Sequence, residues 1–301
     1  MRRSPARWVA PVLLAAVIPL ATAGVAAAEP EQAPVQRYVA LGDSYAAGPL
    51  VPIPTGQPAG CLRSNRNYPS VVAETLGISE FRDVSCSAAT TENITGPQDV
   101  PLGTNPPQLD ALAADTELVT ISIGGNDIGF GDIVTECAQR SPLQPTGSAC
   151  RDHYTAGGTD ELAERIDEAA PDVAGVLAAI DSRAPNARVL LVGYPAILPD
   201  EGPGCFPLVP FSPGDVAYLR GVEKDLNAML AAQAAGTGME FVDTYTPSIG
   251  HDACQLPGTK WVEGLVPTAP AAPVHPNALG MAKIGAVVAG ALDGAAARAS
   301  D

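Results

Sequence analysis

Residues 38–48 read YVALGDSYAAG, and this stretch decides the fold and the chemistry that we expect. An apolar run leads directly into Gly42-Asp43-Ser44. In an open α/β sheet, ligands bind beyond the carboxyl ends of the strands, so Ser44 stands where a nucleophile is useful. Asp and Ser also form ordinary turns and cap helices, so this motif alone leaves a purely structural role open.

Four further runs rich in Val, Ile, Leu and aromatic residues indicate strands covered on both faces. The five expected strands are Arg37–Gly42, Phe81–Ser85, Leu118–Ile123, Arg188–Gly193 and Met239–Val242. Helical patterns follow at Tyr68–Leu76, at Asp160–Ser182 with Thr159 as its cap, at Pro213–Ala235 and at Ala278–Ala297. This alternation predicts an α/β fold, a three-layer α/β/α sandwich around a five-stranded parallel sheet. Long connections such as Ala138–Gly158 are expected to be loops that line a site or carry disulfides.

A second polar motif follows another expected strand. Residues 121–127 read ISIGGND, which places Gly124-Gly125-Asn126-Asp127 at a carboxyl end. The glycines allow close approach of a substrate, and the Asn126 side chain can donate an N–H to a developing oxyanion. A simple Gly-Gly-Asn turn is the alternative.

The candidates for a general base can be counted, because the chain has three histidines. His153 lies in the neighbourhood of Cys137 and Cys150 and is expected on the surface of a loop. His251, beside Asp252, is a reserve candidate. His275 is best placed, since it directly precedes the last expected helix. We therefore expect His275 to be the base that serves Ser44.

Together, Gly42-Asp43-Ser44, Gly124-Gly125-Asn126-Asp127 and His275-Pro276-Asn277 resemble the motif set of the SGNH (GDSL-type) hydrolases. The chain is similar in particular to the secreted actinomycete lipases and esterases of that class, which carry three disulfides. The resemblance implies a flavodoxin-like fold, Ser44 as nucleophile and His275 as general base. It also implies an oxyanion hole formed by the main-chain N–H of Ser44, that of Ala88, and the side chain of Asn126.

The sequence departs from this family pattern at two positions. Ala88 stands where a glycine is usual, and its N–H can still serve provided that its φ is not positive. Ala272 stands where an aspartate usually orients the histidine. We expect the main-chain carbonyl of Ala272 to orient His275 instead, without help from Glu263 or Asp243, and the imidazole to titrate near its ordinary pKa of about 6.5.

The six cysteines form an even set in the part of the chain that we expect to be exported. They are Cys61, Cys86, Cys137, Cys150, Cys205 and Cys254. Three disulfides are expected in an oxidising compartment, and we favour pairing in sequence order among the 15 connectivities that six cysteines allow. No C-x-x-C spacing occurs, so we expect no metal site and no cofactor.

The first 28 residues have the pattern of a signal peptide, with three arginines before an apolar run that ends in alanines. We expect cleavage near Ala28, secretion, and a single domain over residues 29–301. The run is interrupted by proline, so we expect no stable membrane anchor. The formal charge of −16 disfavours binding to nucleic acid or to anionic membranes. We expect a monomer.

The sequence therefore predicts a secreted serine esterase or lipase that acts on a small-molecule or lipid ester. Apolar loop segments such as Phe206–Phe211 favour a groove for an acyl chain, although such segments also pack beneath loops. A carbohydrate deacetylase and a phospholipase remain alternatives on the same residues. A non-catalytic, glycan-binding protein with a degenerate site is the alternative from another class.

Overall fold

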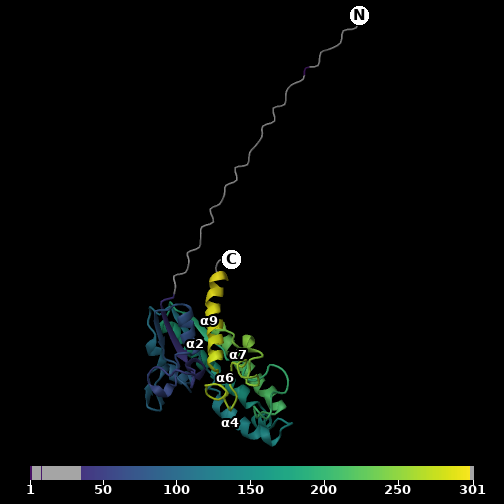
Figure 1. Ribbon diagram of the computed structural model, residues 1–301. Helices are drawn as coiled ribbons and strands as arrows, with labels where there is room; N and C mark the ends of the chain where they lie inside the picture. Colours follow the sequence, from purple (N-terminus) through teal and green to yellow (C-terminus); the bar gives the residue numbers. More distant parts are fainter. Residues whose placement is uncertain (2–7, 9–34, 299–301) are drawn as a thin grey trace. The chain divides into compact units, whose positions relative to one another are not determined.

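The computed structural model describes residues 1, 8 and 35–298, with side chains up to residue 292 (Figure 1). The expected signal peptide and its cleavage position near Ala28 lie outside the described residues. The chain divides into two units, Met1–Gln32 and Ala33–Asp301, and everything below concerns the second. Within the described residues, no helix has both the length and the apolar character needed to cross a bilayer.

A five-stranded parallel sheet forms the centre of this unit. Its strands are β1 (Arg37–Gly42), β2 (Glu80–Asp83), β5 (Leu118–Ser122), β6 (Arg188–Val192) and β7 (Glu240–Val242). They lie in the order β2-β1-β5-β6-β7, with Tyr38 beside Phe81 and Leu118 in the register. All five expected strands are confirmed within a few residues at their ends.

Successive residues of the central strands enter two different cores, one on each face of the sheet. In β1, Val39 and Leu41 belong to the larger core, whereas Tyr38 and Ala40 belong to the smaller one. Side chains alternate between the faces of a strand, so a strand with apolar residues at every position must be covered on both faces. This is why the expected strands showed no polar alternation.

Helices cover both faces of the sheet. On one face α6 (Glu161–Arg183) packs against α7 (Pro213–Thr237), and on the other α2 (Tyr68–Thr75) lies beside α9 (Ala278–Arg298) (Figure 1). The expected three-layer sandwich is therefore confirmed. The expected cap Thr159 is wrong, because the N-cap of α6 is Asp160, whose carboxylate accepts from two main-chain N–H groups of the first turn.

The long connections contain more structure than expected. The segment predicted as a loop from Ala138 holds the end of α4 (Phe130–Arg140) and the whole of α5 (Ala149–Tyr154). An antiparallel pair, β3 (Gln98–Val100) and β4 (Gly103–Asn105), was also not expected. The remaining short helices are α1 (Ser44–Ala47), η1 (Ala59–Cys61), α3 (Thr91–Thr95), η2 (Gln108–Ala111), η3 (Ser141–Leu143) and α8 (Tyr245–Ser248).

Three disulfides brace these connections. They join Cys61 to Cys86, Cys137 to Cys150, and Cys205 to Cys254. Pairing in sequence order is therefore confirmed. The first bridge closes a segment that contains α2 and β2, and the third closes one that contains α7 and β7. The Cys137–Cys150 bridge ties α4 to α5, and it adds to the packing of Ile133 and Tyr154 of these helices in the larger core.

Candidate active site

The carboxyl ends of β1, β5 and β6 meet at one edge of the sheet and carry the candidate residues. Ser44 follows β1, Asn126 follows β5, and Tyr194 follows β6. All three side chains line one cleft, as expected for the ligand-binding edge of a parallel sheet. Strand order alone therefore brings together residues that lie far apart in the sequence.

The turn that presents Ser44 depends on a glycine. Gly42 has φ +129, and a Cβ at this position would lie 2.4 Å from the main-chain oxygen of Ser122. Asp43 then caps α1 by accepting the N–H of Tyr45 at 2.8 Å. Ser44 is the first residue of α1, so its main-chain N–H has no acceptor inside the helix and remains available to a ligand.

Ser44 and His275 are in direct contact. Nε2 of His275 lies 2.7 Å from Oγ of Ser44, and Nδ1 lies 2.7 Å from the carbonyl oxygen of Pro273. A carbonyl can only accept, so Nδ1 carries the ring proton and the neutral Nε2 accepts the serine hydroxyl. Burial lowers the pKa of His275 below its ordinary value, against the opposing effect of the Pro273 carbonyl. This corrects the expectation of a pKa near that value.

The prediction that the Ala272 carbonyl orients His275 is wrong by one residue. The Ala272 oxygen accepts the main-chain N–H of His275 at 3.2 Å, which closes a turn over residues 272–275. Pro273 occupies the second position of that turn, and Val274, with φ +58, the third. The turn engages the Ala272 carbonyl with the backbone, so the next carbonyl along the chain meets the imidazole.

Val274 holds an uncommon conformation for a β-branched residue, and its neighbours fix it there. A positive φ costs such a residue about 1–3 kcal/mol. The hydroxyl of Tyr45 donates to the Val274 carbonyl at 2.7 Å. Tyr45 follows Ser44 directly in α1, so this bond fastens the histidine loop to the helix that carries the serine.

A buried ion pair anchors the other side of the histidine loop. The carboxylate of Glu263 is fully buried and lies 3.4 Å from Nζ of Lys260. It also accepts hydrogen bonds from Asn277 at 2.7 Å and from the main chain and side chain of Thr268. The Glu263 N–H donates to the carbonyl of His275 at 3.0 Å. Glu263 therefore positions the loop through its backbone and gives no carboxylate to the imidazole.

The other candidates for base or acid face elsewhere. His153 lies on α5, 3.9 Å from Glu136. His251 stacks on the ring of Trp261, and its Nδ1 contacts the carbonyl of Thr259. The carboxylate of Asp243 accepts main-chain N–H groups at the start of α8. Of the three histidines, all described, His275 alone contacts Ser44.

Ala88 and Asn126 lie together beside the serine turn. Nδ2 of Asn126 donates one proton to the carbonyl of Ala89 at 2.9 Å, which leaves its second proton for a ligand. In the described loop, the main-chain N–H groups of Ser87 and Ala89 are engaged, whereas that of Ala88 makes no internal hydrogen bond. Ala88 has φ +63, so the condition of a non-positive φ that the sequence analysis set for this donor is not met. The main-chain N–H of Ala88 is still present as a donor, but the backbone there has a left-handed conformation that glycine would adopt more easily.

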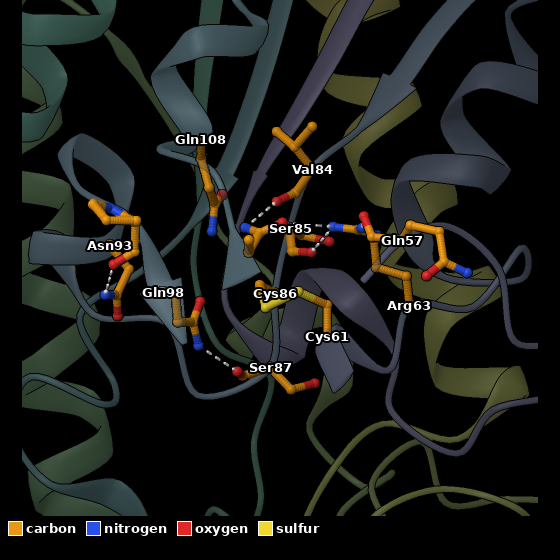
Figure 2. Close-up of a disulfide and its surroundings, with 12 residues drawn as sticks. Gln57, Cys61, Arg63, Val84, Ser85, Cys86, Ser87, Asn93, Gln98 and Gln108 are labelled. Carbon is orange, nitrogen blue, oxygen red and sulfur yellow. Dashed lines mark hydrogen bonds between the residues drawn. A yellow bond between two sulfur atoms is a disulfide. The ribbon is translucent and has the colours of Figure 1, made fainter. Parts of the chain in front are cut away.

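Two groups hold the loop that carries Ala88, as Figure 2 shows. The Cys61–Cys86 disulfide joins its start to η1. The side chain of Gln98 donates to the carbonyl of Ser87 at 2.9 Å. The N–H of Cys86 donates to the carbonyl of Gly42 at 2.9 Å. This bond also holds the start of the loop against the serine turn.

Comparison with known proteins agrees with this arrangement. The profile of the GDSL-like Lipase/Acylhydrolase family matches residues 40–283, which extend from β1 into α9. The chain belongs to this family. It is 43% identical over 266 residues to Lipase 2 of Streptomyces coelicolor, covering 86% of this chain and 87% of that protein. It is 32% identical over 250 residues to a lipase of Streptomyces rimosus, covering 82% of each chain.

Solved structures support the same assignment. The extracellular lipase of Streptomyces rimosus is 31% identical, with a TM-score of 0.65 over 84% of this chain and 97% of its own. Phospholipase A1 of Streptomyces albidoflavus is 26% identical, with a TM-score of 0.66 over 85% of this chain and 98% of its own. The protein is thus a carboxylic ester hydrolase with the fold of these lipases.

A buried chain of hydrogen bonds in this hydrolase was not expected from the sequence. The Gly125 N–H donates to the hydroxyl of Tyr194 at 2.8 Å, and that hydroxyl donates to the Asp43 carboxylate at 2.6 Å. Burial raises the pKa of Asp43 to about 7, although Tyr194 and Tyr45 oppose the shift. This series of hydrogen bonds links the serine turn to the turn that carries Asn126. The one feature of the sequence that could have indicated these hydrogen bonds is the position of Tyr194 just after an expected strand.

The cleft of the hydrolase that opens beside Ser44 is almost wholly apolar. Its volume is about 720 Å³ including the open space at its mouth. Apolar side chains from α4, from α7 and from the segment after β6 form its walls. Phe211 belongs to this lining, as the apolar loop segment suggested, whereas Leu208 of the same segment is exposed.

Proposed function

We propose that the hydrolase is a secreted serine esterase or lipase that acts through an acyl-enzyme on Ser44, with His275 as general base. The observation that carries the proposal is the 2.7 Å contact between Nε2 of His275 and Oγ of Ser44 at the mouth of an apolar cleft. Family membership supports it, since these relatives are named lipases and esterases.

In the proposed mechanism, Nε2 of His275 removes the Ser44 proton as Oγ attacks the ester carbonyl. The developing oxyanion is stabilised by the main-chain N–H groups of Ser44 and Ala88 and by the free proton of Asn126. The imidazolium returns its proton to the leaving alkoxide, and water then attacks the acyl-enzyme by the same route. The Pro273 carbonyl holds the working tautomer, as a carboxylate would, but with less charge stabilisation.

The apolar cleft supports an acyl chain as the group that enters it. A phospholipid is the second candidate, supported by the likeness to phospholipase A1. A sugar acetate is disfavoured, because an acetyl group has a single methyl to place against the apolar side chains that line the cleft. The contact between Ser44 and His275 argues against a non-catalytic glycan-binding role, which would not need it.

We also propose that residues 1–28 are a signal peptide cleaved near Ala28, and that residues 29–301 form one domain that acts as a monomer without a stable membrane anchor. Export is supported by three disulfides and by the similarity to a Streptomyces rimosus lipase described as extracellular. Mass spectrometry of the protein recovered from culture medium tests the cleavage, and a mature chain that retained residues 1–28 would contradict it.

A panel of esters tests the proposed function. It runs from acetate to palmitate, with a phospholipid and an acetylated sugar. We expect wild type to hydrolyse the alkyl esters, and Ser44→Ala and His275→Asn to lose nearly all activity. The matched control is His251→Asn, which removes a histidine that does not contact Ser44. Absence of turnover in wild type, or loss of activity in the His251 variant alone, would contradict the proposal.

A further inference from the structure

A buried carboxyl group faces the apolar cleft and takes no part in the mechanism above. Glu223 lies on α7, is 9% exposed, and lines the cleft between the apolar side chains of Val222 and Leu226. Its two oxygens lie 3.2 and 3.3 Å from a single donor, the N–H of Ile197. No other described group donates to it.

Glu223 differs from the other buried carboxylates of the described chain in having a single hydrogen-bond donor. Asp43 receives Tyr45 N–H and Tyr194 O–H on separate oxygens. Asp215 receives two hydroxyls and two main-chain N–H groups. Glu263 receives three donors and an ammonium group. Buried carboxylates are normally satisfied in this way, because an unpaired one costs stability. Glu223 is therefore the buried carboxylate with the least complete set of hydrogen bonds.

The surroundings of Glu223 favour its neutral form. Burial raises the pKa of Glu223 well above its ordinary value, against the Ile197 N–H and Lys224, and Asp252 adds to the rise. Nζ of Lys224 lies 2.5 Å from a carboxylate oxygen of Asp200, and neither residue lines the cleft. Asp43, Tyr45 and Tyr194 also line the cleft, and Tyr45 and Tyr245 interact electrostatically with Glu223. A neutral carboxyl has one O–H to donate.

We propose that Glu223 is a specificity-determining residue, whose neutral carboxyl donates a hydrogen bond to an oxygen atom on the acyl chain in the cleft. The preferred substrates are then esters of oxygenated acyl chains, with a ketone or hydroxyl part-way along an otherwise apolar chain. The inference rests on the proposed function, because it places the acyl chain in this cleft. A fully apolar chain leaves the carboxyl unpaired, which the enzyme discriminates against.

The proposal predicts that the preference for a ketone on the acyl chain and the preference for a hydroxyl depend differently on pH. Neutral Glu223 donates to a ketone, whereas the ionised carboxylate can only accept and repels it. Preference for a ketone is therefore present at low pH and is lost as pH rises through the raised pKa of Glu223. A hydroxyl can donate, so preference for a hydroxyl survives ionisation.

The experiment compares p-nitrophenyl octanoate with oxo-octanoates whose ketone is moved one carbon at a time along the chain. For each enzyme the readout is the ratio of kcat/KM for each oxo ester to kcat/KM for the plain ester. In wild type at low pH we expect a ratio on the order of ten at one ketone position. In Glu223→Met, which cannot donate, that ratio falls to about one. The matched control is Asp225→Asn, an exposed charge on the same helix.

A second variant keeps the test decisive if Glu223→Met does not fold. Glu223→Gln retains a donor that does not titrate, so its ketone preference should not change with pH, whereas that of wild type should disappear at high pH. Ratios near one at every ketone position in wild type would overturn the inference. So would equal ratios in wild type and Glu223→Met. Failure of wild type to hydrolyse plain octanoate would instead contradict the proposed function.

Discussion

Replacing the buried acid of the serine turn should change how the stability of the protein depends on pH. Asp43 is 1% exposed, and burial raises its pKa to about 7, from 3.8 for a free side chain. The folded state therefore binds a proton more tightly than the unfolded state. Stability from this group is complete below about pH 4 and is lost progressively until about pH 7. The difference of roughly three pKa units corresponds to about 4 kcal/mol.

Asp43→Asn removes this titration while retaining an oxygen that can accept the Tyr45 N–H. We expect the difference in free energy of unfolding, variant minus wild type, to increase by about 4 kcal/mol between about pH 4 and pH 8. Any constant cost of the amide beside Tyr194 cancels in this comparison. Urea unfolding followed by circular dichroism, with disulfides intact, measures both proteins across the range.

The control is Asp225→Asn, which removes a carboxylate from an exposed position. Its stability relative to wild type should change little with pH. If the curves for Asp43→Asn and wild type run parallel from pH 4 to pH 8, Asp43 does not carry the raised pKa, and the effect ascribed to its burial is refuted.

Three further predictions concern the catalytic groups and the loop that holds the base. Asn126→Ala should lower kcat/KM for a short ester by about 100- to 1000-fold without unfolding the protein, and an effect below about threefold would remove Asn126 from the oxyanion hole. The pH profile of kcat/KM should rise to its plateau with a midpoint below about 6.5, because burial lowers the pKa of His275, and a higher midpoint would contradict this. Glu263→Gln should cost about 3–5 kcal/mol in urea unfolding because it leaves Lys260 buried without its partner, and the double variant with Lys260→Met should recover part of the loss.

Much of the fold could be predicted because the relevant signals are local. Consecutive apolar residues in β1, β5 and β6 indicate strands with a core on each face, and the structure contains both cores. The position of Ser44 follows from its place after β1. Helices α4 and α5 escaped prediction although Ile133 and Tyr154 enter the larger core, because they are short and the Cys137–Cys150 bridge that ties them together exists only in the folded chain.

The orientation of the base could not be predicted in the same way. Which carbonyl meets His275 depends on the positive φ of Val274, which is fixed by the hydroxyl of Tyr45. Nothing in the local sequence requires that conformation of a valine, because a β-branched residue avoids it in the absence of outside contacts. The carbonyl expected from the sequence, that of Ala272, therefore lies one residue before the carbonyl that meets the imidazole.

The sequence by itself determined the layers of the fold, the serine, the histidine and the asparagine, because periodicity and strand ends are properties of short stretches. The tertiary structure alone decided the contacts between distant stretches. It brought Tyr194 to Asp43, turned Pro273 toward His275, and set Glu223 into the cleft beside Ser44. Each of these depends on side chains that meet only after the sheet has assembled, and burial at those meeting points shifts the pKa values that the chemistry uses.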